Sequence, residues 1–192
     1  MEGSPWNSLE AVKVAVAILT PVLILVLTYI VNRAARRVED AQWANRKLIE
    51  RRLDVYDRMA PGLNDLYCFF ATVGDFREIE PPDAVDRKRK LDKEFHVNKY
   101  LFSKQFGDFY RQFIRLAFEE NVDYATDARI RADPETQEDE MGEDRWKDAW
   151  GRLFSPKGKR NSRFEINQAY ERLMECFAQE LGVTPRQELK AA

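Results

Sequence analysis

The chain has 192 residues, with 31 lysines and arginines against 33 aspartates and glutamates, and its formal net charge is -2. A domain that binds bulk nucleic acid is usually strongly basic, so nucleic acid is not an expected partner. The two cysteines, Cys68 and Cys176, and a single histidine are too few for a zinc site or a CxxC redox pair, so we expect no metal and no cofactor.

Residues 14–31 read VAVAILTPVLILVLTYIV and contain no charged side chain. A helix of this length rises about 27 Å, close to the roughly 30 Å of a bilayer's hydrocarbon core. Arg33, Arg36 and Arg37 follow the run, whereas residues 1–13 contain one basic side chain. Because basic flanks stay in the cytoplasm, the pattern predicts a single-pass protein of the plasma (bacterial inner) membrane, with an extracytoplasmic leader and a cytoplasmic C-terminal domain.

The apolar run also contains Pro21, with Thr20 and Thr28 on one face of the expected helix. Membrane helices tolerate proline where neighbouring helices or hydroxyl groups satisfy the freed carbonyl, and hydroxyl residues favour helix–helix contacts. The pattern therefore predicts that several copies associate. Two alternatives to an anchor stay open: a cleaved signal peptide, which normally has a basic leader and a shorter apolar run, and the core helix of a soluble protein.

Residues 32–60 lack glycine and proline and are rich in helix formers, which predicts a juxtamembrane helix, or stalk. An apolar seam with alternating steps of four and three residues crosses Pro61, which should end or kink the helix near Ala60. The seam has two interpretations, the core of a folded domain or a coiled coil that joins several anchors. Its candidate oligomer contacts are Ile49, Leu53, Tyr56 and Leu63.

Residues 61–182 are predicted to form one compact, all-α cytosolic domain of about six helices, because apolar residues recur at helical spacing and no segment alternates with a period of two. Pro81 and Pro82 indicate a loop, with Asp83 at the start of the next helix. A later helix has an aromatic face suited to a core: Phe106, Phe109, Tyr110, Phe113 and Ala117.

The last third of the chain alternates charged loops with helical segments. Residues 133–144 are rich in carboxylates and are predicted to form a mobile acidic loop. A closing helix follows, with Gly182 as its stop, and residues 183–192 are assigned to a C-terminal tail.

Two clusters of basic residues are candidates for binding an anion or lipid head groups. The first, within residues 87–93, has three interpretations: a solvated helix face, contact with anionic lipids, or a pocket for a small anionic signal. The second, within residues 157–163, could complete the lipid contact or the pocket. The candidates are Arg87, Lys88, Arg89, Lys90, Lys93, Lys157, Lys159, Arg160 and Arg163.

The one candidate for catalysis is the segment RKLDKEFH, in which His96 follows Arg89 by seven residues. It is similar to the Arg-x(4–6)-His signature of the HEPN ribonucleases, which are small all-α proteins. The resemblance implies an arginine and a histidine that act on an RNA phosphate and its neighbouring hydroxyl. Lys90 stands where that family usually has asparagine, aspartate or histidine.

Three functions fit these patterns. The preferred one is a membrane-anchored helical module that is not an enzyme, because the sequence contains no complete catalytic set. Its expected partners are the lipid bilayer, another copy of the chain or a different protein, and a small anionic signal. The alternatives are a membrane-perturbing effector of a bacterial defence or toxin system, triggered through its cytosolic domain, and an anchored HEPN-like ribonuclease.

Overall fold

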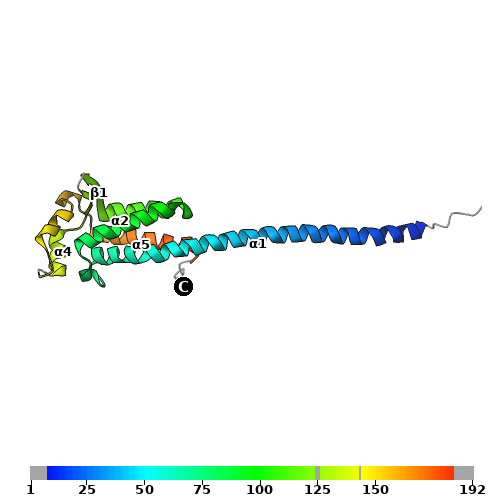
Figure 1. The fold of residues 1–192 in the computed structure, drawn as a ribbon, viewed down its shortest axis with the longest axis horizontal. Helices are drawn as coiled ribbons and strands as arrows, with labels where there is room; N and C mark the ends of the chain where they lie inside the picture. The colour runs from blue at the N-terminus through cyan, green and yellow to red at the C-terminus, as the bar shows by residue number, and fades with distance from the viewer. Residues whose placement is uncertain (1–7, 124–125, 143, 184–192) are drawn as a thin grey trace, which may run out of the picture. The chain divides into compact units, whose positions relative to one another are not determined.

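The computed structural model describes residues 8–123, 126–142 and 144–183, so most of the predicted leader and of the tail lies outside the described residues. The chain divides into two units, Met1–Lys47 and Leu48–Ala192. As predicted, the described residues are mostly helical and the fold is all-α overall. The α-helices, coloured in chain order in Figure 1, are α1 (Ser8–Ala71), α2 (Pro81–Asn98), α3 (Lys104–Ala117), α4 (Pro134–Met141) and α5 (Arg163–Glu180).

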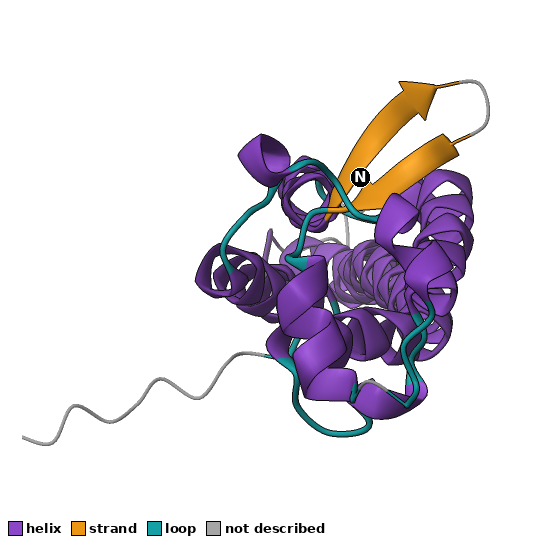
Figure 2. Ribbon diagram, turned by 90° about the vertical axis from the view of Figure 1, so that its left-hand side faces the viewer, coloured by secondary structure: helices purple, strands orange, loops and turns teal. Residues whose placement is uncertain are grey.

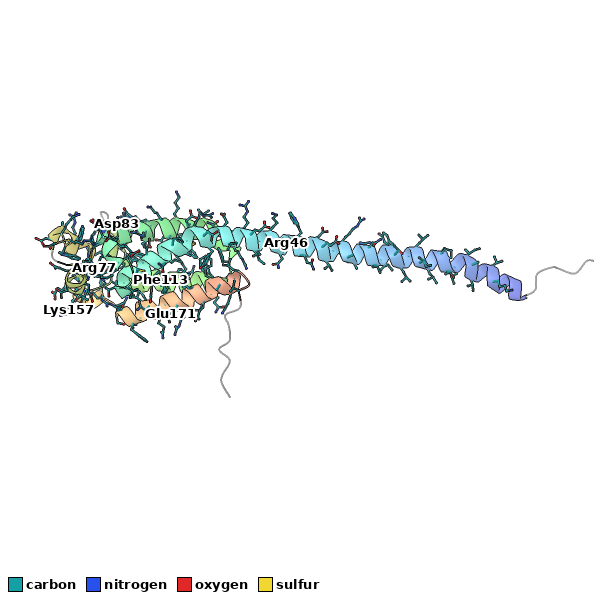
Figure 3. All side chains as sticks on the ribbon, turned by 90° about the horizontal axis from the view of Figure 1, so that it is seen from below. Arg46, Arg77, Asp83, Phe113, Lys157 and Glu171 are labelled. Carbon is teal, nitrogen blue, oxygen red and sulfur yellow. The ribbon has the colours of Figure 1, made fainter. Side chains whose placement is uncertain are left out.

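Within the first unit, helix α1 carries the apolar run. By length and composition, this helix can cross a membrane. Its apolar side chains are exposed, for example Ile18 at 63% and Leu25 at 70%, and Figure 3 shows the side chains of this part of α1 projecting from the ribbon. Pro21 lies inside α1 and does not end it.

Within the second unit, α1 does not end at Ala60 but continues through Pro61 and Gly62 to Ala71. A proline removes one helical hydrogen bond, and here core residues lie on both sides of it. Met59 and Leu63 are both fully buried. Packing therefore holds the helix together across the proline, and the second unit includes α1 from Leu48 onward.

The core of the second unit lies between α1, α2, α3 and α5. Figure 2 shows helices gathered beside one another, with the strands at one side. Helix α3 packs along α5. The predicted aromatic face of α3 is confirmed, since Phe106, Tyr110, Phe113 and Ala117 are buried and Phe109 packs at the edge. Phe113 is labelled in Figure 3. The aromatic face of α3 therefore forms part of the core of the second unit.

The helix ends follow local chemistry. Helix α2 begins at Pro81, two residues earlier than predicted, because proline suits the first helical position, and Asp83 accepts a hydrogen bond from Glu80 N at 3.3 Å. Ser162 caps α5 by accepting from Glu165 N at 3.2 Å. Gly182, with φ of 76°, follows the end of α5 as predicted.

The described residues also contain a β-hairpin, which the sequence analysis did not predict. Strands β1 (Phe118–Asp123) and β2 (Thr126–Ile130) pair antiparallel, with Phe118 opposite Ile130. Figure 2 shows this hairpin projecting beside the helices. Phe118 and Ile130 are buried, but Glu119 is also buried, so charged residues obscure the alternation that would have indicated a strand.

The acidic segment 133–144 is not an irregular loop, because Pro134–Met141 forms helix α4. Asp133 occupies the N-cap position and Pro134 the first turn, and negative charge is favourable at a helix N-terminus. Gln137 and Met141 are buried and attach α4 to the second unit. Short 3₁₀ turns complete the described structure at Phe76–Glu78, Lys99–Leu101, Asp148–Leu153 and Lys157–Lys159.

Candidate functional site

The apolar run of α1 is followed directly by an exposed basic flank. Arg33, Arg36 and Arg37 are exposed, and together with Tyr29 they line an open depression in the first unit. Arg33 Nη1 donates to Tyr29 Oη at 3.4 Å. Tyrosine and arginine at the end of an apolar helix suit the boundary between hydrocarbon and water. This arrangement can place the tyrosine ring among lipid head groups and the guanidinium groups against phosphates.

The hydroxyl residues of the run are exposed as well. Thr20 Oγ1 donates to Val16 O at 2.7 Å, so its proton is used inside its own helix. Thr28 is exposed. Thr20, Thr28 and the ring of Pro21 thus lie on the surface of α1, where a second helix could contact them.

The predicted oligomer seam divides between surface and core. Leu63 is fully buried, and the ring of Tyr56 meets that of Phe177 edge to face at 5.0 Å between centroids. These two residues belong to the core of the second unit. Ile49 is partly buried, and Leu53 is the most exposed of the four, at 48%. The seam is therefore largely used for intramolecular packing, and only its N-terminal part is accessible.

In the first basic cluster, several side chains form ion pairs. Arg87 Nε lies 2.8 Å from Asp65 Oδ2, and Arg89 Nη1 lies 2.6 Å from Asp86 Oδ1. Lys90 and Lys93 are exposed. The cluster therefore presents less uncompensated charge than its sequence indicates.

Lys88 is the one buried residue of the first basic cluster, with a side chain that is 8% exposed. Its Nζ lies 2.8 Å from Asp92 Oδ2 and 3.0 Å from Glu120 Oε1, and Tyr110 Oη donates to Asp92 Oδ1 at 2.8 Å. Burial alone would lower the pKa of Lys88, but the hydrogen bonds to the two carboxylates outweigh it and raise the pKa. This network joins α2, α3 and β1.

In the second basic cluster, Lys159 pairs with Glu119, and Arg160 pairs with Asp133. The hydrogen bond from Lys159 is the main cause that lowers the pKa of Glu119. Lys157 is exposed. One lysine of each cluster reaches β1, Lys88 at Glu120 and Lys159 at Glu119, and these neighbouring strand residues face opposite sides.

Arg89 and His96, the candidate catalytic pair, both lie on α2. Both side chains are exposed, and Arg89 pairs with Asp86. Their separation along the helix is about 10 Å at 1.5 Å per residue. The ribonuclease resemblance stays a prediction. The cysteines are structural in character: Cys176 is buried, Cys68 partly so, and burial raises the pKa of both thiols.

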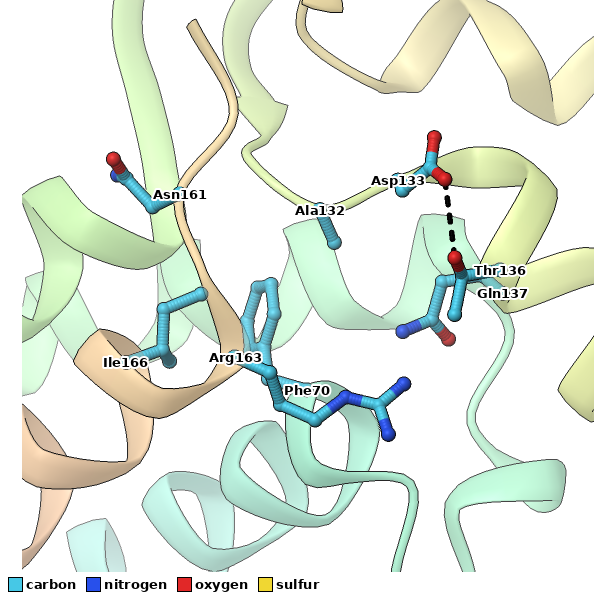
Figure 4. A pocket seen from close by; sticks show the side chains of 8 residues that line it. All are labelled: Phe70, Ala132, Asp133, Thr136, Gln137, Asn161, Arg163 and Ile166. Carbon is cyan, nitrogen blue, oxygen red and sulfur yellow. Dashed lines mark hydrogen bonds between the residues drawn. The ribbon is translucent and has the colours of Figure 1, made fainter.

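Sequence reasoning missed a small cavity in the second unit, shown in Figure 4. Its volume is about 150 Å³, and its walls come from the last turn of α1, the start of α4 and the start of α5. Arg163 and Gln137 line it together with Phe70 and Asp133. Gln137 lies in the segment that the sequence analysis took for an acidic loop, and no sequence signal indicated that an amide there is buried.

Comparison with protein-family models, with curated proteins and with solved structures finds no match for this chain. The function is therefore argued from the residues and their geometry alone.

Proposed function

We propose that this protein is a single-pass membrane anchor joined to a helical binding module, and that it is not an enzyme. Residues 14–31 cross the bilayer, the leader lies outside, and the second unit lies in the cytoplasm. There it binds a protein partner, another copy of the chain or a small anionic signal.

The observation that carries this proposal is the exposed apolar surface of α1. Soluble monomers rarely expose a large continuous apolar surface, and those that occur are usually interaction sites. Along residues 14–31 every side chain that the structure describes is exposed, and no charge interrupts the run. A soluble core helix would instead be mostly buried. The basic flank at Arg33, Arg36 and Arg37 supports an orientation with the second unit inside.

The test is extraction of the full chain from membranes at alkaline pH, which releases peripheral proteins and leaves inserted ones. We expect the wild type to stay in the membrane fraction. The double substitution Leu23→Lys, Leu25→Lys places two charges in the run, at a cost of about 5 to 7 kcal/mol for insertion, and should release the protein. Leu53→Lys, at an exposed leucine outside the run, is the matched control and should stay inserted. A wild type that is fully released would contradict the proposal.

A second candidate is a membrane-perturbing effector, in which the second unit would gather several spans until the bilayer leaks. It is supported by the proline and hydroxyl side chains on the surface of α1, at Thr20, Pro21 and Thr28, because such residues occur at contacts between membrane helices. Overexpression should then collapse the membrane potential, and deletion of residues 14–31 should abolish the effect. Native mass spectrometry of the detergent-solubilised chain would show an assembly larger than a dimer. A monomer or dimer that leaves the potential intact would remove this candidate.

A further inference from the structure

Two apolar side chains at the C-terminal end of α2 are almost fully exposed. Val97, in the last turn of α2, is 70% exposed. Tyr100 follows in the 3₁₀ turn Lys99–Leu101 and is 87% exposed, the largest value for a large apolar side chain among the described residues. A single exposed apolar residue is ordinary on a soluble protein, so the neighbours of these two side chains decide what the surface can bind.

Three lysines accompany the two apolar side chains. Lys90 and Lys93 are exposed on α2, and steps of three and four residues place them on one helical face with Val97. Lys99 Nζ lies 5.1 Å from the centroid of the Tyr100 ring. Within the described ranges, none of these three lysines forms an ion pair. The five residues together are called the α2 patch.

The carboxylates nearest to the α2 patch along the chain are paired with cations outside it. Residues 86–104 contain three carboxylates, and the pairs are Asp86 with Arg89, Asp92 with Lys88, and Glu94 with Arg58. From α5, Glu180 reaches the backbone of Ser103 after the patch, and this carboxylate pairs with Arg52 at 2.9 Å. The positive charge of the patch is therefore available to an anionic partner.

We propose that the α2 patch docks on the surface of a bilayer that contains anionic lipids. The side chains of Val97 and Tyr100 lie at the level of the head groups, and the three lysines face lipid phosphates. A tyrosine ring favours the boundary between hydrocarbon and water, and each lysine close to an anionic surface adds attraction. An acidic protein would also attract the lysines, but the exposed valine and tyrosine beside them favour lipid.

This inference rests on the proposed function in one respect, because residues 14–31 hold the second unit close to a bilayer. Only residues 32–47 separate this run from the second unit, a length of about 24 Å as a helix. A tether of this kind raises the effective concentration of the lipid surface, so a patch of weak intrinsic affinity is sufficient. The patch contains no residue of the run, so the chain can stay inserted where docking fails.

The test uses the full chain in lipid nanodiscs, with a fluorophore on a single cysteine. Cys68 and Cys176 are replaced by alanine, and His96→Cys places the label at an exposed position of α2 next to Val97. Gln168→Cys, at an exposed position of α5, carries the label in the control protein.

The nanodiscs consist of phosphatidylcholine, with or without about 30% phosphatidylserine, and contain a lipid-bound quencher of fluorescence. We expect quenching of about twofold or more at position 96 in the anionic discs, and its loss at about 1 M salt, because salt screens the lysines. Little quenching is expected in the neutral discs, or at position 168 in either kind of disc.

Two double variants with the same net charge locate the contact. Lys90→Gln, Lys93→Gln removes two lysines of the α2 patch, and it should lower the ratio of docked to undocked protein by about 30-fold. Lys157→Gln, Arg172→Gln removes two exposed cations outside the patch and should leave the quenching unchanged. Tyr100→Ser should also weaken the quenching, since the contact of the ring with the head groups is lost.

Three outcomes with an inserted chain would overturn the proposal: no quenching at position 96 in anionic discs, equal quenching in neutral discs, and undiminished quenching in the Lys90→Gln, Lys93→Gln variant. The first of these would leave the membrane anchor standing and assign the lysines to a soluble acidic partner. A chain that does not enter the discs would instead contradict the proposed function and remove the tether on which docking depends.

Discussion

Glu119 and Glu120, neighbours on strand β1, bind lysines from different parts of the chain. Glu119 pairs with Lys159, which follows the hairpin, and Glu120 Oε1 lies 3.0 Å from Nζ of Lys88, which precedes it on α2. Because consecutive strand residues face opposite sides, β1 is attached through both of its faces. Lys88 and Lys159, which the sequence analysis treated as candidates for binding an anion, thus hold the hairpin against the rest of the second unit.

Replacing Lys88 should destabilise the second unit. Lys88→Met leaves Asp92, Glu120 and the hydroxyl of Tyr110 without their common cation, at a cost of about 1 to 3 kcal/mol, since the two carboxylates keep some contact with water. Urea unfolding followed by circular dichroism measures the change. Lys90→Met, at an exposed lysine on the same helix, should change the free energy of unfolding by less than about 0.5 kcal/mol. Equal effects of the two substitutions would contradict the structural role of Lys88.

Tyr110 should make the protein sensitive to alkali. Burial and the neighbouring Asp92 raise its pKa well above the usual value of about 10, so the folded state keeps the phenolic proton where the unfolded state loses it. The resulting stabilisation is complete below about pH 10 and disappears as the pH rises through the folded-state pKa. Tyr110→Phe should lose about 1 kcal/mol at neutral pH, and the gap to wild type should close above pH 10. Parallel pH curves of the two proteins would contradict this assignment.

Thr72 has a backbone conformation that disfavours its own side chain. Its φ of 54° lies in the left-handed region, where β-branched residues are rare and asparagine is common. Thr72→Asn should raise the free energy of unfolding by about 0.5 to 1 kcal/mol. Thr72→Val keeps the branching but removes the acceptor of Arg163, and should lower the free energy of unfolding. A Thr72→Asn variant that is no more stable than the wild type in the same urea titration would show that the backbone strain is misjudged.

Substitution of His96 distinguishes the hypothesis of a ribonuclease from that of a binding module. It is exposed on α2, so His96→Ala should change stability by less than about 0.5 kcal/mol. If the protein is not an enzyme, this variant should also leave unchanged any effect of the overexpressed protein on growth or on cellular RNA. Loss of RNA cleavage in a folded His96→Ala variant would revive the resemblance to the HEPN ribonucleases.

The helices were predictable where apolar spacing and end signals agree. The stripe from Phe106 to Ala117 and the stop at Gly182 follow from local sequence, because each depends on residues within one helix. The hairpin was not predictable in this way, since the inward-facing Glu119 is tolerated only through Lys159 and Ser155, which come much later in the chain. The continuation of α1 through Pro61 likewise depends on tertiary packing, which outweighs the lost hydrogen bond.

The candidate sites show the same division. The candidate membrane span was predictable from the sequence, because membrane insertion depends on the length of an apolar run and on the charges that flank it. The basic clusters stay candidates for binding an anion, but the sequence could not show that Asp65, Glu120 and Asp133, which are distant along the chain, pair with Arg87, Lys88 and Arg160. The cavity at Gln137 and Arg163 depends on three helix ends that meet only in the folded unit.

The most direct test of the membrane topology is cysteine labelling in intact bacterial cells with a reagent that does not cross membranes. Cys68 and Cys176 are first replaced by alanine, and a single cysteine is introduced by Ser4→Cys in the leader or by Gly158→Cys in an exposed turn of the second unit. We predict that the Ser4→Cys protein is labelled in intact cells and that the Gly158→Cys protein is labelled only after permeabilisation. Labelling of Gly158→Cys in intact cells, or exclusion of both sites until permeabilisation, would contradict a single span with its second unit in the cytoplasm.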